Sequence, residues 1–188
     1  MRGRDKFLKY KKIINLLVKL YSLLPKKVRR KRLVKARNKI GVWGIVNRYA
    51  LLKSLCKSCG DNVLIGENVY LFSVENMSIG DNVSIHPMSY IDATGGLTIG
   101  NDVSIAHGTT IMTTSHKYAE KDIPIKDQGC LVETVEISNN VWIGAKATIL
   151  CGIKIKEGSV VGANAVVTKN VDKDNIVAGV PAKVIKTR

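Results

Sequence analysis

Aliphatic residues recur at every sixth position over most of the chain beyond residue 60. The first run comprises Ile65, Leu71, Ile79, Ile85, Ile91, Ile99, Ile105 and Ile111, and the second comprises Ile137, Ile143, Ile149, Ile155, Val161 and Val167. Within each run the step is six residues, except from 71 to 79 and from 91 to 99, where it is eight. A six-residue step on a helix of about 3.6 residues per turn forms no stripe, so this pattern excludes a helix.

A six-residue period fits a short strand followed by a corner. Three such units return the chain to its starting azimuth, so that successive coils stack at the spacing of hydrogen-bonded strands, about 4.8 Å. The residue after the ladder position is often a glycine, which suits a corner that needs a positive φ or has no room for a β-carbon. These glycines are Gly66, Gly80, Gly100, Gly144 and Gly162. We therefore predict an all-β domain, a triangular parallel β-helix. The spacing does not give its hand, and the general rule for parallel crossovers favours a right-handed turn.

Charge divides the chain into two unlike parts. Residues 1–60 hold 19 basic and 1 acidic residue, a net charge of +18, whereas residues 61–188 hold 11 basic and 14 acidic residues, a net charge of −3; together they give +15. We therefore predict a basic helical leader over 1–60 and a β-helix domain over 61–188. The second part carries a loop inserted at 112–136 and a C-terminal cap at 172–188.

The leader begins with an amphipathic pattern that predicts a helix ending near Pro25. Its apolar positions are Phe7, Tyr10, Ile14, Leu17, Tyr21 and Leu24. The basic tract KKVRRKRLVKARNK follows. One interpretation is peripheral contact of residues 1–40 with the anionic inner face of the cell membrane, where each basic residue contributes about 1 kcal/mol. The other is packing on the β-helix or on a neighbouring subunit. Nucleic-acid binding is disfavoured, because the tract is nearly free of aromatic residues and no reader motif follows it.

Two further features predict a cytoplasmic protein. The apolar stretch 13–24 is interrupted by Lys19, lacks a small-residue cleavage site and is too short to span a bilayer, so it is not a typical export signal. The cysteines have no secreted framework spacing, and the single C-x-x-C pair lacks a second pair to complete a zinc site. They are Cys56, Cys59, Cys130 and Cys151.

The repeat is interrupted between Ile111 and Ile137 by a segment much longer than one six-residue step. Long excursions from a rigid scaffold usually carry function. This one contains His116 near its start. Histidine is the side chain best suited to accept a proton near neutral pH, so His116 is the candidate general base.

Four motifs relate residues 61–186 to a known family: TTIMTTSHKY, NNVWIGAKATILCGIKIKEG, SVVGANAVVTKNV and IVAGVPAKVIK. With them the chain resembles the hexapeptide-repeat acyltransferases, especially the maltose and galactoside O-acetyltransferases and the enzymes that acetylate capsular or exopolysaccharide sugars. The resemblance implies a left-handed β-helix, a homotrimer with its active site between neighbouring subunits, and acetyl-CoA as the donor, with no metal. It predicts an O-acetyltransferase that acts on a saccharide, such as a cell-surface polysaccharide precursor, and the basic leader suggests an acceptor held on a lipid.

The same resemblance assigns roles to individual residues. His116 matches the histidine that takes the hydroxyl proton of the acceptor sugar. The donor contacts would be Trp142 beside the cleft, Ala145 and Ala163 along the pantetheine arm, Thr168 and Lys169 near the pyrophosphate, and Lys183 and Lys186 near the 3′-phosphoadenosine. The galactoside enzymes have arginines at the last two positions. Lysine keeps the charge there but loses the planar bidentate contact.

Asp92 is the candidate on the acceptor side. It lies one coil before the loop, and we hypothesise that it orients His116 or binds a sugar hydroxyl. Aspartate at a corner is also a common turn residue. The serine acetyltransferases have a D-H-A-T-G motif in which a histidine follows the aspartate. Ala93 stands at that place here, which disfavours an amino-acid acceptor.

Three other functions fit parts of the sequence. An amino sugar can replace the hydroxyl acceptor, because the same base serves both nucleophiles. A γ-type carbonic anhydrase shares the fold and binds zinc through three histidines, and this chain has His86, His107 and His116. The closing AGVPAKVIK is typical of the transferases instead. A non-catalytic scaffold held at the membrane by the leader would bind no CoA.

Overall fold

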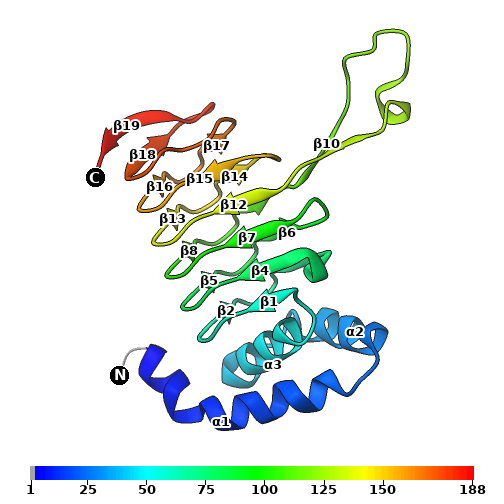
Figure 1. The fold of residues 1–188 in the computed structure, drawn as a ribbon, viewed down its shortest axis with the longest axis vertical. Coiled ribbons are helices and arrows are strands. Elements are labelled where there is room, and N and C mark those ends of the chain that lie inside the picture. The colour runs from blue at the N-terminus through cyan, green and yellow to red at the C-terminus, as the bar shows by residue number, and fades with distance from the viewer. Residues whose placement is uncertain (1–2) are drawn as a thin grey trace.

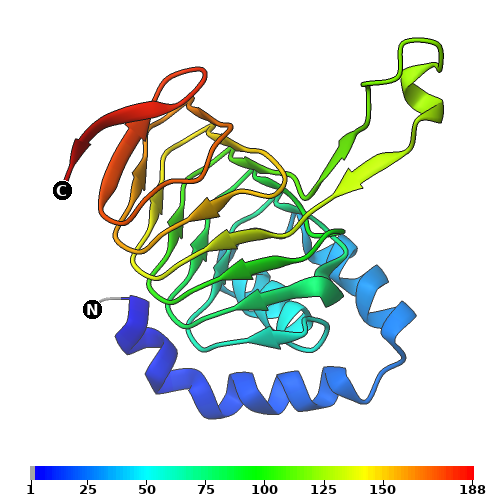
Figure 2. The same ribbon diagram turned by 45° about the horizontal axis from the view of Figure 1, so that its top comes forward.

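The computed structural model describes residues 3–188, and from Ser58 onward the chain winds into stacked triangular coils whose sides are short strands (Figures 1 and 2). Sheet A consists of β1 (Ser58–Cys59), β4 (Met77–Ile79), β7 (Leu97–Ile99), β12 (Val135–Ile137) and β15 (Lys154–Ile155). Sheet B consists of β2 (Leu64–Ile65), β5 (Ser84–Ile85), β8 (Ser104–Ile105), β13 (Trp142–Ile143), β16 (Val160–Val161), β18 (Asn175–Ala178) and β19 (Lys183–Thr187). Sheet C consists of β3 (Tyr70–Phe72), β6 (Tyr90–Asp92), β9 (Thr110–Ile111), β14 (Thr148–Ile149) and β17 (Val166–Val167).

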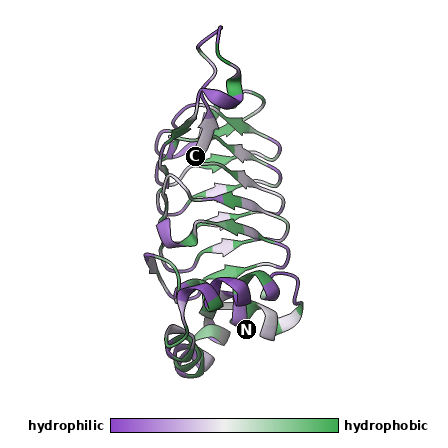
Figure 3. Cartoon of the chain, turned by 90° about the vertical axis from the view of Figure 1, so that its right-hand side faces the viewer, coloured by the Kyte–Doolittle hydropathy of each residue, from purple (hydrophilic) through white to green (hydrophobic). Residues whose placement is uncertain are grey.

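The strands of successive coils are parallel, and their register places like residues above one another. Ile105 of β8 pairs with Ile85 on one side and with Ile143 on the other. All three side chains are fully buried. Figure 3 shows the apolar residues along the strands of the stack. The all-β parallel β-helix predicted from the six-residue period is therefore confirmed, and β19, which pairs antiparallel to β18, closes its C-terminal end.

The sequence offered two reasons for a glycine at each corner, a positive φ or a lack of room for a β-carbon. The structure shows that the two requirements fall on different residues. None of the five glycines after the ladder positions has a positive φ. They are small because the next coil is close: a β-carbon on Gly144 would lie 2.5 Å from the main-chain nitrogen of Ala163. The left-handed residue comes two positions later, as at Asn68 (φ 56°) and Asn164 (φ 57°). Asparagine tolerates this conformation better than most residues.

Both eight-residue steps widen a coil at the corner between sheets C and A. The first holds the short 3-10 helix η1 (Val74–Asn76). The second is a turn in which the main-chain N–H of Gly96 donates to the carbonyl of Ala93. The corner therefore has extra main chain in the coils that precede the loop.

Three helices close the N-terminal end of the stack: α1 (Gly3–Ser22), α2 (Lys26–Ala36) and α3 (Gly41–Lys53) (Figure 1). Side chains of α3 bind carbonyl groups of the first coil. Arg48 Nε donates to the carbonyl of Ile65 at 2.9 Å, and the hydroxyl of Tyr49 donates to that of Gly60, also at 2.9 Å. The guanidinium of Arg48 also binds the carbonyls of Ala36 and Lys39. This buried arginine therefore joins α2, α3 and the first coil.

Helix α1 packs beneath α3. The ring of Phe7 meets that of Tyr49 edge-on at 5.8 Å, and the hydroxyl of Tyr21 donates to Asn47 at 2.5 Å. Lys11 forms an ion pair with Asp61 at 2.6 Å. Within residues 3–188, no helix has both the length and the apolar content needed to cross a membrane.

The interrupted coil sends out a long arm, residues 112–134, that projects from the stack (Figures 1 and 2). Its base is a hairpin of β10 (Thr114–His116) and β11 (Cys130–Val132), and its tip contains the 3-10 helix η2 (Ile125–Asp127). The amide of Gln128 donates to the carbonyls of Glu120 and Ile123, both at 2.7 Å. The tip therefore has a defined conformation without a core of its own.

The stacked core predicts that alanine substitutions at two neighbouring residues of β15 lower the free energy of unfolding by very different amounts. Ile155 is fully buried between Ile137 and Val171, whereas Lys154 is exposed. Ile155→Ala should lower the free energy of unfolding by about 2–5 kcal/mol, because it leaves a cavity between coils. The matched variant Lys154→Ala removes only a surface ion pair and should cost less than about 1 kcal/mol. Urea unfolding followed by circular dichroism measures both, and equal costs would contradict the stacked core.

Candidate active site

His116 is the last residue of β10, at the base of the arm. Its main chain pairs with Cys130 of β11, and its side chain is exposed. No hydrogen bond to the imidazole occurs within the part of the chain that the structure describes. The hairpin therefore fixes the backbone of His116 and leaves both ring nitrogens accessible to a substrate.

Asp92 lies at the end of β6 and is 9% exposed. One carboxylate oxygen accepts hydrogen bonds from the main-chain N–H of Thr94 at 3.0 Å and from its hydroxyl at 2.6 Å. The other accepts a hydrogen bond from the hydroxyl of Thr114 at 2.9 Å. Thr114 and His116 are two residues apart on β10, so their side chains share a face of the strand. Asp92 does not contact His116 but holds the strand that carries it.

Two opposing effects set the ionisation of Asp92. Burial raises the pKa of this carboxyl group, but hydrogen bonds from Thr94, Thr114 and the main chain of Thr113 outweigh burial and hold the pKa below its ordinary value. Asp92 is therefore a carboxylate at neutral pH and an acceptor of hydrogen bonds.

The turn at residues 92–96 holds both sides of the arm. The main-chain N–H of Gly95 donates to the hydroxyl of Thr113 at 2.8 Å, and the hydroxyl of Thr134 donates to the carbonyl of Gly95 at 2.7 Å. A β-carbon on Gly95 would lie 2.6 Å from the carbonyl oxygen of Thr113. Thr113, Thr134 and Gly95 were not among the site residues predicted from the sequence. One sequence feature could have indicated them: threonines stand where the six-residue repeat stops and where it restarts, and the preceding coil contains a Thr-Gly-Gly turn.

Three of the predicted donor contacts lie together on another part of the stack. Trp142, on β13, is 55% exposed on the outer face of sheet B. Ala145 and Ala163 follow β13 and β16 at the corner between sheets B and C. They occupy the same place in successive coils, and the main-chain N–H of Asn164 donates to the carbonyl of Ala145 at 2.8 Å. These three residues therefore form one open edge.

The remaining predicted contacts lie in two other places. Thr168 and Lys169 follow β17, at the corner between sheets C and A, and both are exposed. Lys183 and Lys186 are exposed on β19, opposite Ala178 and Ile176 of β18 at the end of sheet B.

Within one chain, the predicted base and the donor edge are separated. The arm leaves the corner between sheets C and A, the corner at which Thr168 and Lys169 also lie in a later coil. Trp142 instead lies on sheet B, and Ala145 lies at the corner between sheets B and C. No hydrogen bond or ion pair joins His116 to any predicted donor contact in the described residues. One copy therefore does not bring the whole predicted site together.

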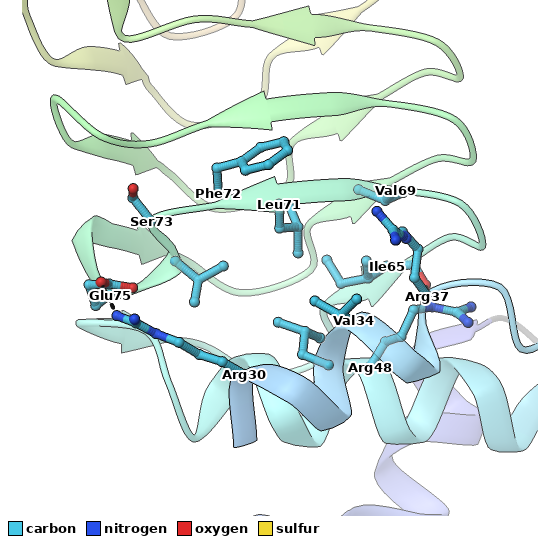
Figure 4. A pocket seen from close by; sticks show the side chains of 12 residues that line it. Arg30, Val34, Arg37, Arg48, Ile65, Val69, Leu71, Phe72, Ser73 and Glu75 are labelled. Carbon is cyan, nitrogen blue, oxygen red and sulfur yellow. Dashed lines mark hydrogen bonds and ion pairs between the residues drawn. The ribbon is translucent and has the colours of Figure 1, made fainter. Parts of the chain in front are cut away.

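Within residues 3–188, neither a cluster of metal-ligating side chains nor the cavity beside α2 lies at the arm. Residues 3–188 contain no group of three or more His, Cys, Asp or Glu side chains that could hold a metal ion. A cavity of about 250 Å³ lies between α2 and the first coil (Figure 4). Arg30 and Glu75 form an ion pair at one end of it, and Arg37 and Arg48 lie at the other. None of the predicted site residues lines this cavity.

Comparison with known proteins identifies the family. The family model described as bacterial transferase hexapeptide (six repeats) matches residues 134–169. The galactoside O-acetyltransferase of Escherichia coli K12 is 31% identical over 143 residues, which are 76% of this chain and 69% of that protein. The chain belongs to the hexapeptide-repeat acetyltransferases. The putative lipopolysaccharide biosynthesis O-acetyl transferase WbbJ of Escherichia coli K12 is 34% identical over 126 residues, which are 67% of this chain and 58% of that protein. Other curated relatives match over shorter stretches, and for two of them the match spans about a quarter of their own length.

Solved structures agree with this assignment. A maltose O-acetyltransferase from Clostridium difficile 630 superposes with a TM-score of 0.76, at 26% identity over 92% of this chain and 88% of that one. A galactoside acetyltransferase in complex with coenzyme A superposes with a TM-score of 0.75, at 30% identity over 86% of this chain and 80% of that one. The family resemblance and the left-handed β-helix that it implies are confirmed. The right-handed turn that the general crossover rule favours is wrong for this hexapeptide-repeat fold.

The hydrogen bonds that the Asp92 carboxylate accepts at the base of the arm form a carboxylate clamp. This clamp predicts that the stability lost in an Asp92 variant depends on pH. Because the folded-state pKa of Asp92 is lowered, its stabilisation is present above the unfolded pKa of about 3.9 and is lost as the pH falls through the folded value. Asp92→Asn should therefore lower the free energy of unfolding by about 1.5–3 kcal/mol at neutral pH, through lost charge-assisted bonds. This difference from the wild type should shrink near pH 3.

The control is Asp122→Asn, because Asp122 is exposed near the tip of the arm. Urea unfolding of the three proteins at both pH values measures the effect. An Asp92→Asn cost that stays constant with pH would show that the charge of Asp92 does not hold the arm.

Proposed function

We propose that this protein is an acetyl-CoA-dependent O-acetyltransferase that acetylates a saccharide hydroxyl. The observation that carries the proposal is an exposed imidazole on a hydrogen-bonded arm, in a chain whose relatives include galactoside and maltose O-acetyltransferases. The relative with bound coenzyme A supports the donor. A precursor of a bacterial cell-surface polysaccharide, built in the cytoplasm, is the acceptor class we favour.

In the proposed reaction, His116 acts as the general base. A sugar hydroxyl is too weakly acidic to ionise near neutral pH, so the imidazole takes its proton as the oxygen attacks the thioester carbonyl carbon. The tetrahedral intermediate collapses with cleavage of the carbon–sulfur bond, and the imidazolium returns the proton to the departing CoA thiolate. No acyl-enzyme forms, and the step as proposed uses no metal. Main-chain N–H groups near the thioester would stabilise the oxyanion, at about 3 kcal/mol for one donor.

Asp92 acts in this scheme as a positioning residue. Its carboxylate already accepts hydrogen bonds from Thr94 and Thr114, which supports a role in fixing β10 over direct binding of a sugar hydroxyl. Loss of this clamp would leave the imidazole intact but less well aligned, which is costly because transfer requires close alignment of the base and the nucleophile.

We assign the donor to the open edge of sheet B. Trp142 would flank the cleft, and the main chain at Ala145 and Ala163 would meet the pantetheine arm. Thr168 and Lys169 would lie toward the pyrophosphate. Lys183 and Lys186 would provide positive charge for the 3′-phosphoadenosine, and their exposure on β19 leaves both ammonium groups free to reach a phosphate.

The separation of His116 from Trp142 in one chain supports a homotrimer with shared active sites. In a ring of identical copies, the arm of one copy can lie against sheet B of the next, and three equivalent sites result. Each site would then take its base from one copy and its donor edge from the neighbour.

The first test replaces the proposed base. His116→Ala should lower acetyl transfer about 10²–10⁴-fold, because the hydroxyl loses its proton acceptor, while acetyl-CoA still binds. Transfer is measured by release of the CoA thiol across a panel of sugars and amino sugars, and donor binding by calorimetry. Lys117→Ala, at the next exposed position of the arm, should keep full activity. Normal transfer by His116→Ala would refute the mechanism, and transfer only to amino sugars would redirect it to N-acetylation.

The second test asks whether two copies build one site. His116→Ala and Trp142→Ala should each be nearly inactive alone. Co-expressed, they form mixed trimers in which about a quarter of the sites combine an intact base with an intact donor edge, if copies assort at random. Transfer activity should therefore recover to about a quarter of the wild-type value. Absence of recovery in mixed trimers verified by mass spectrometry would place the whole site within one chain.

A further inference from the structure

Helix α1 has two apolar faces, and only one of them is packed. Phe7, Ile14 and Tyr21 lie against α3 and the core, as the amphipathic pattern predicted. A second stripe of apolar side chains remains open: Ile13 is 62% exposed, Leu16 58%, Leu20 53% and Leu23 82%. Ile13, Leu16 and Leu20 follow one another at steps of three and four, so they line one side of the helix. Leu23 lies in the turn directly after the helix ends at Ser22. A single amphipathic face does not account for this second stripe.

Lysines accompany the open stripe. Lys9, Lys12 and Lys19 are exposed, and a turn of about 100° per residue places them on the same half of α1 as the stripe. Helix α2 adds further exposed basic side chains, at Lys26, Lys27, Lys31, Arg32 and Lys35. Asp5 is the only acidic residue among the first sixty. Lysines of α1 therefore border the stripe, within a leader that is strongly positive as a whole.

More apolar side chains are exposed at the start of α3. Trp43 is 73% exposed, and its neighbours Ile40 and Val42 are 81% and 74% exposed. The amide of Asn47 donates to the carbonyl of Trp43, and the same side chain accepts the hydroxyl of Tyr21. The first turn of α3 is thereby joined to the C-terminal half of α1. Tryptophan beside basic residues is typical of segments that lie at a lipid interface.

We propose that the open face of α1 docks this protein on an anionic lipid surface. Apolar residues bordered by lysines match the acyl and headgroup layers of such a surface, whereas a protein partner would need its own acidic apolar groove. The helix lies across the end of the stack, so the coils would stand away from the lipid (Figure 1). This inference rests on the proposed function and deepens it. Docking on lipid would hold the enzyme beside a lipid-linked saccharide.

The geometry suits such an acceptor. The coil from which the arm leaves is the third from the helices, about 10 Å above the first coil at the strand spacing. In a homotrimer with parallel stacks, the three copies of α1 would face the same way. Three weak contacts on one surface bind far more strongly than one.

The test is sedimentation of the purified full-length protein with vesicles of phosphatidylglycerol and phosphatidylcholine, or of phosphatidylcholine alone. The wild type should sediment with the anionic vesicles only, and less as salt rises. The double variant Leu16→Ser with Leu20→Ser should partition on the order of ten-fold less, because two leucines no longer enter the lipid. The double variant Lys12→Gln with Lys19→Gln should also bind less. The matched control, Val184→Ser with Ile185→Ser, changes equally exposed residues at the other end of the stack and should bind as the wild type does.

The outcomes separate this inference from the proposed function. Vesicle binding by a protein that transfers no acetyl group would sustain the inference and refute the function. Acetyl transfer to a soluble sugar should be unchanged in the Leu16/Leu20 variant, which also verifies its fold. Equal sedimentation of that variant and the wild type would overturn the inference. The inference would also be overturned if the Leu16/Leu20 variant changed its oligomeric mass but not its vesicle binding. The stripe would then be a contact between copies.

Discussion

Main-chain hydrogen bonds between coils hold each aliphatic residue above its equivalent in the next coil, and the rest of the structure depends on this stacking. Ile85, Ile105 and Ile143 form one such column, with no exposed surface. The close approach also fixes the corners, where the main chain of one coil leaves no room for a β-carbon at Gly144. Strands of two or three residues would be unstable alone. Stacked in register, they form a rigid prism.

The rigid prism provides a fixed base for the arm. The arm has little core of its own, but threonines at its two sides bind a turn of the preceding coil. The buried carboxylate of Asp92 is central to that junction, and its lowered pKa reflects the hydrogen bonds that it accepts there. His116 thus has a fixed backbone and an exposed imidazole, which forms no hydrogen bond with residues 3–188. This arrangement is compatible with the general-base role proposed for His116.

The repeat region was predictable because one physical requirement, a buried aliphatic residue on each side of the triangle, recurs in every coil. The spacing of Ile65 to Ile111 therefore gave the triangular coils directly, whereas their hand came only from the family. The clamp between Asp92 and Thr114 was not predictable, because it joins residues of different coils through the shape of a turn. The spacing of apolar residues also predicted a single apolar face for α1. The residues of that face pack as expected at Ile14 and Tyr21, but Leu16 and Leu20 form a second face that only the packing shows to be open.

A stack of parallel strands has two terminal edges, and each would otherwise present unpaired main-chain groups to another copy. Here the helical leader covers the first edge, where Arg48, Tyr49 and Lys53 bind carbonyl groups of the opening coil. The antiparallel return of β19 covers the last. The length of the rod is thereby limited to that of one chain. The helical leader consequently also shields the main chain of the first coil, which would otherwise be open to pairing with another copy.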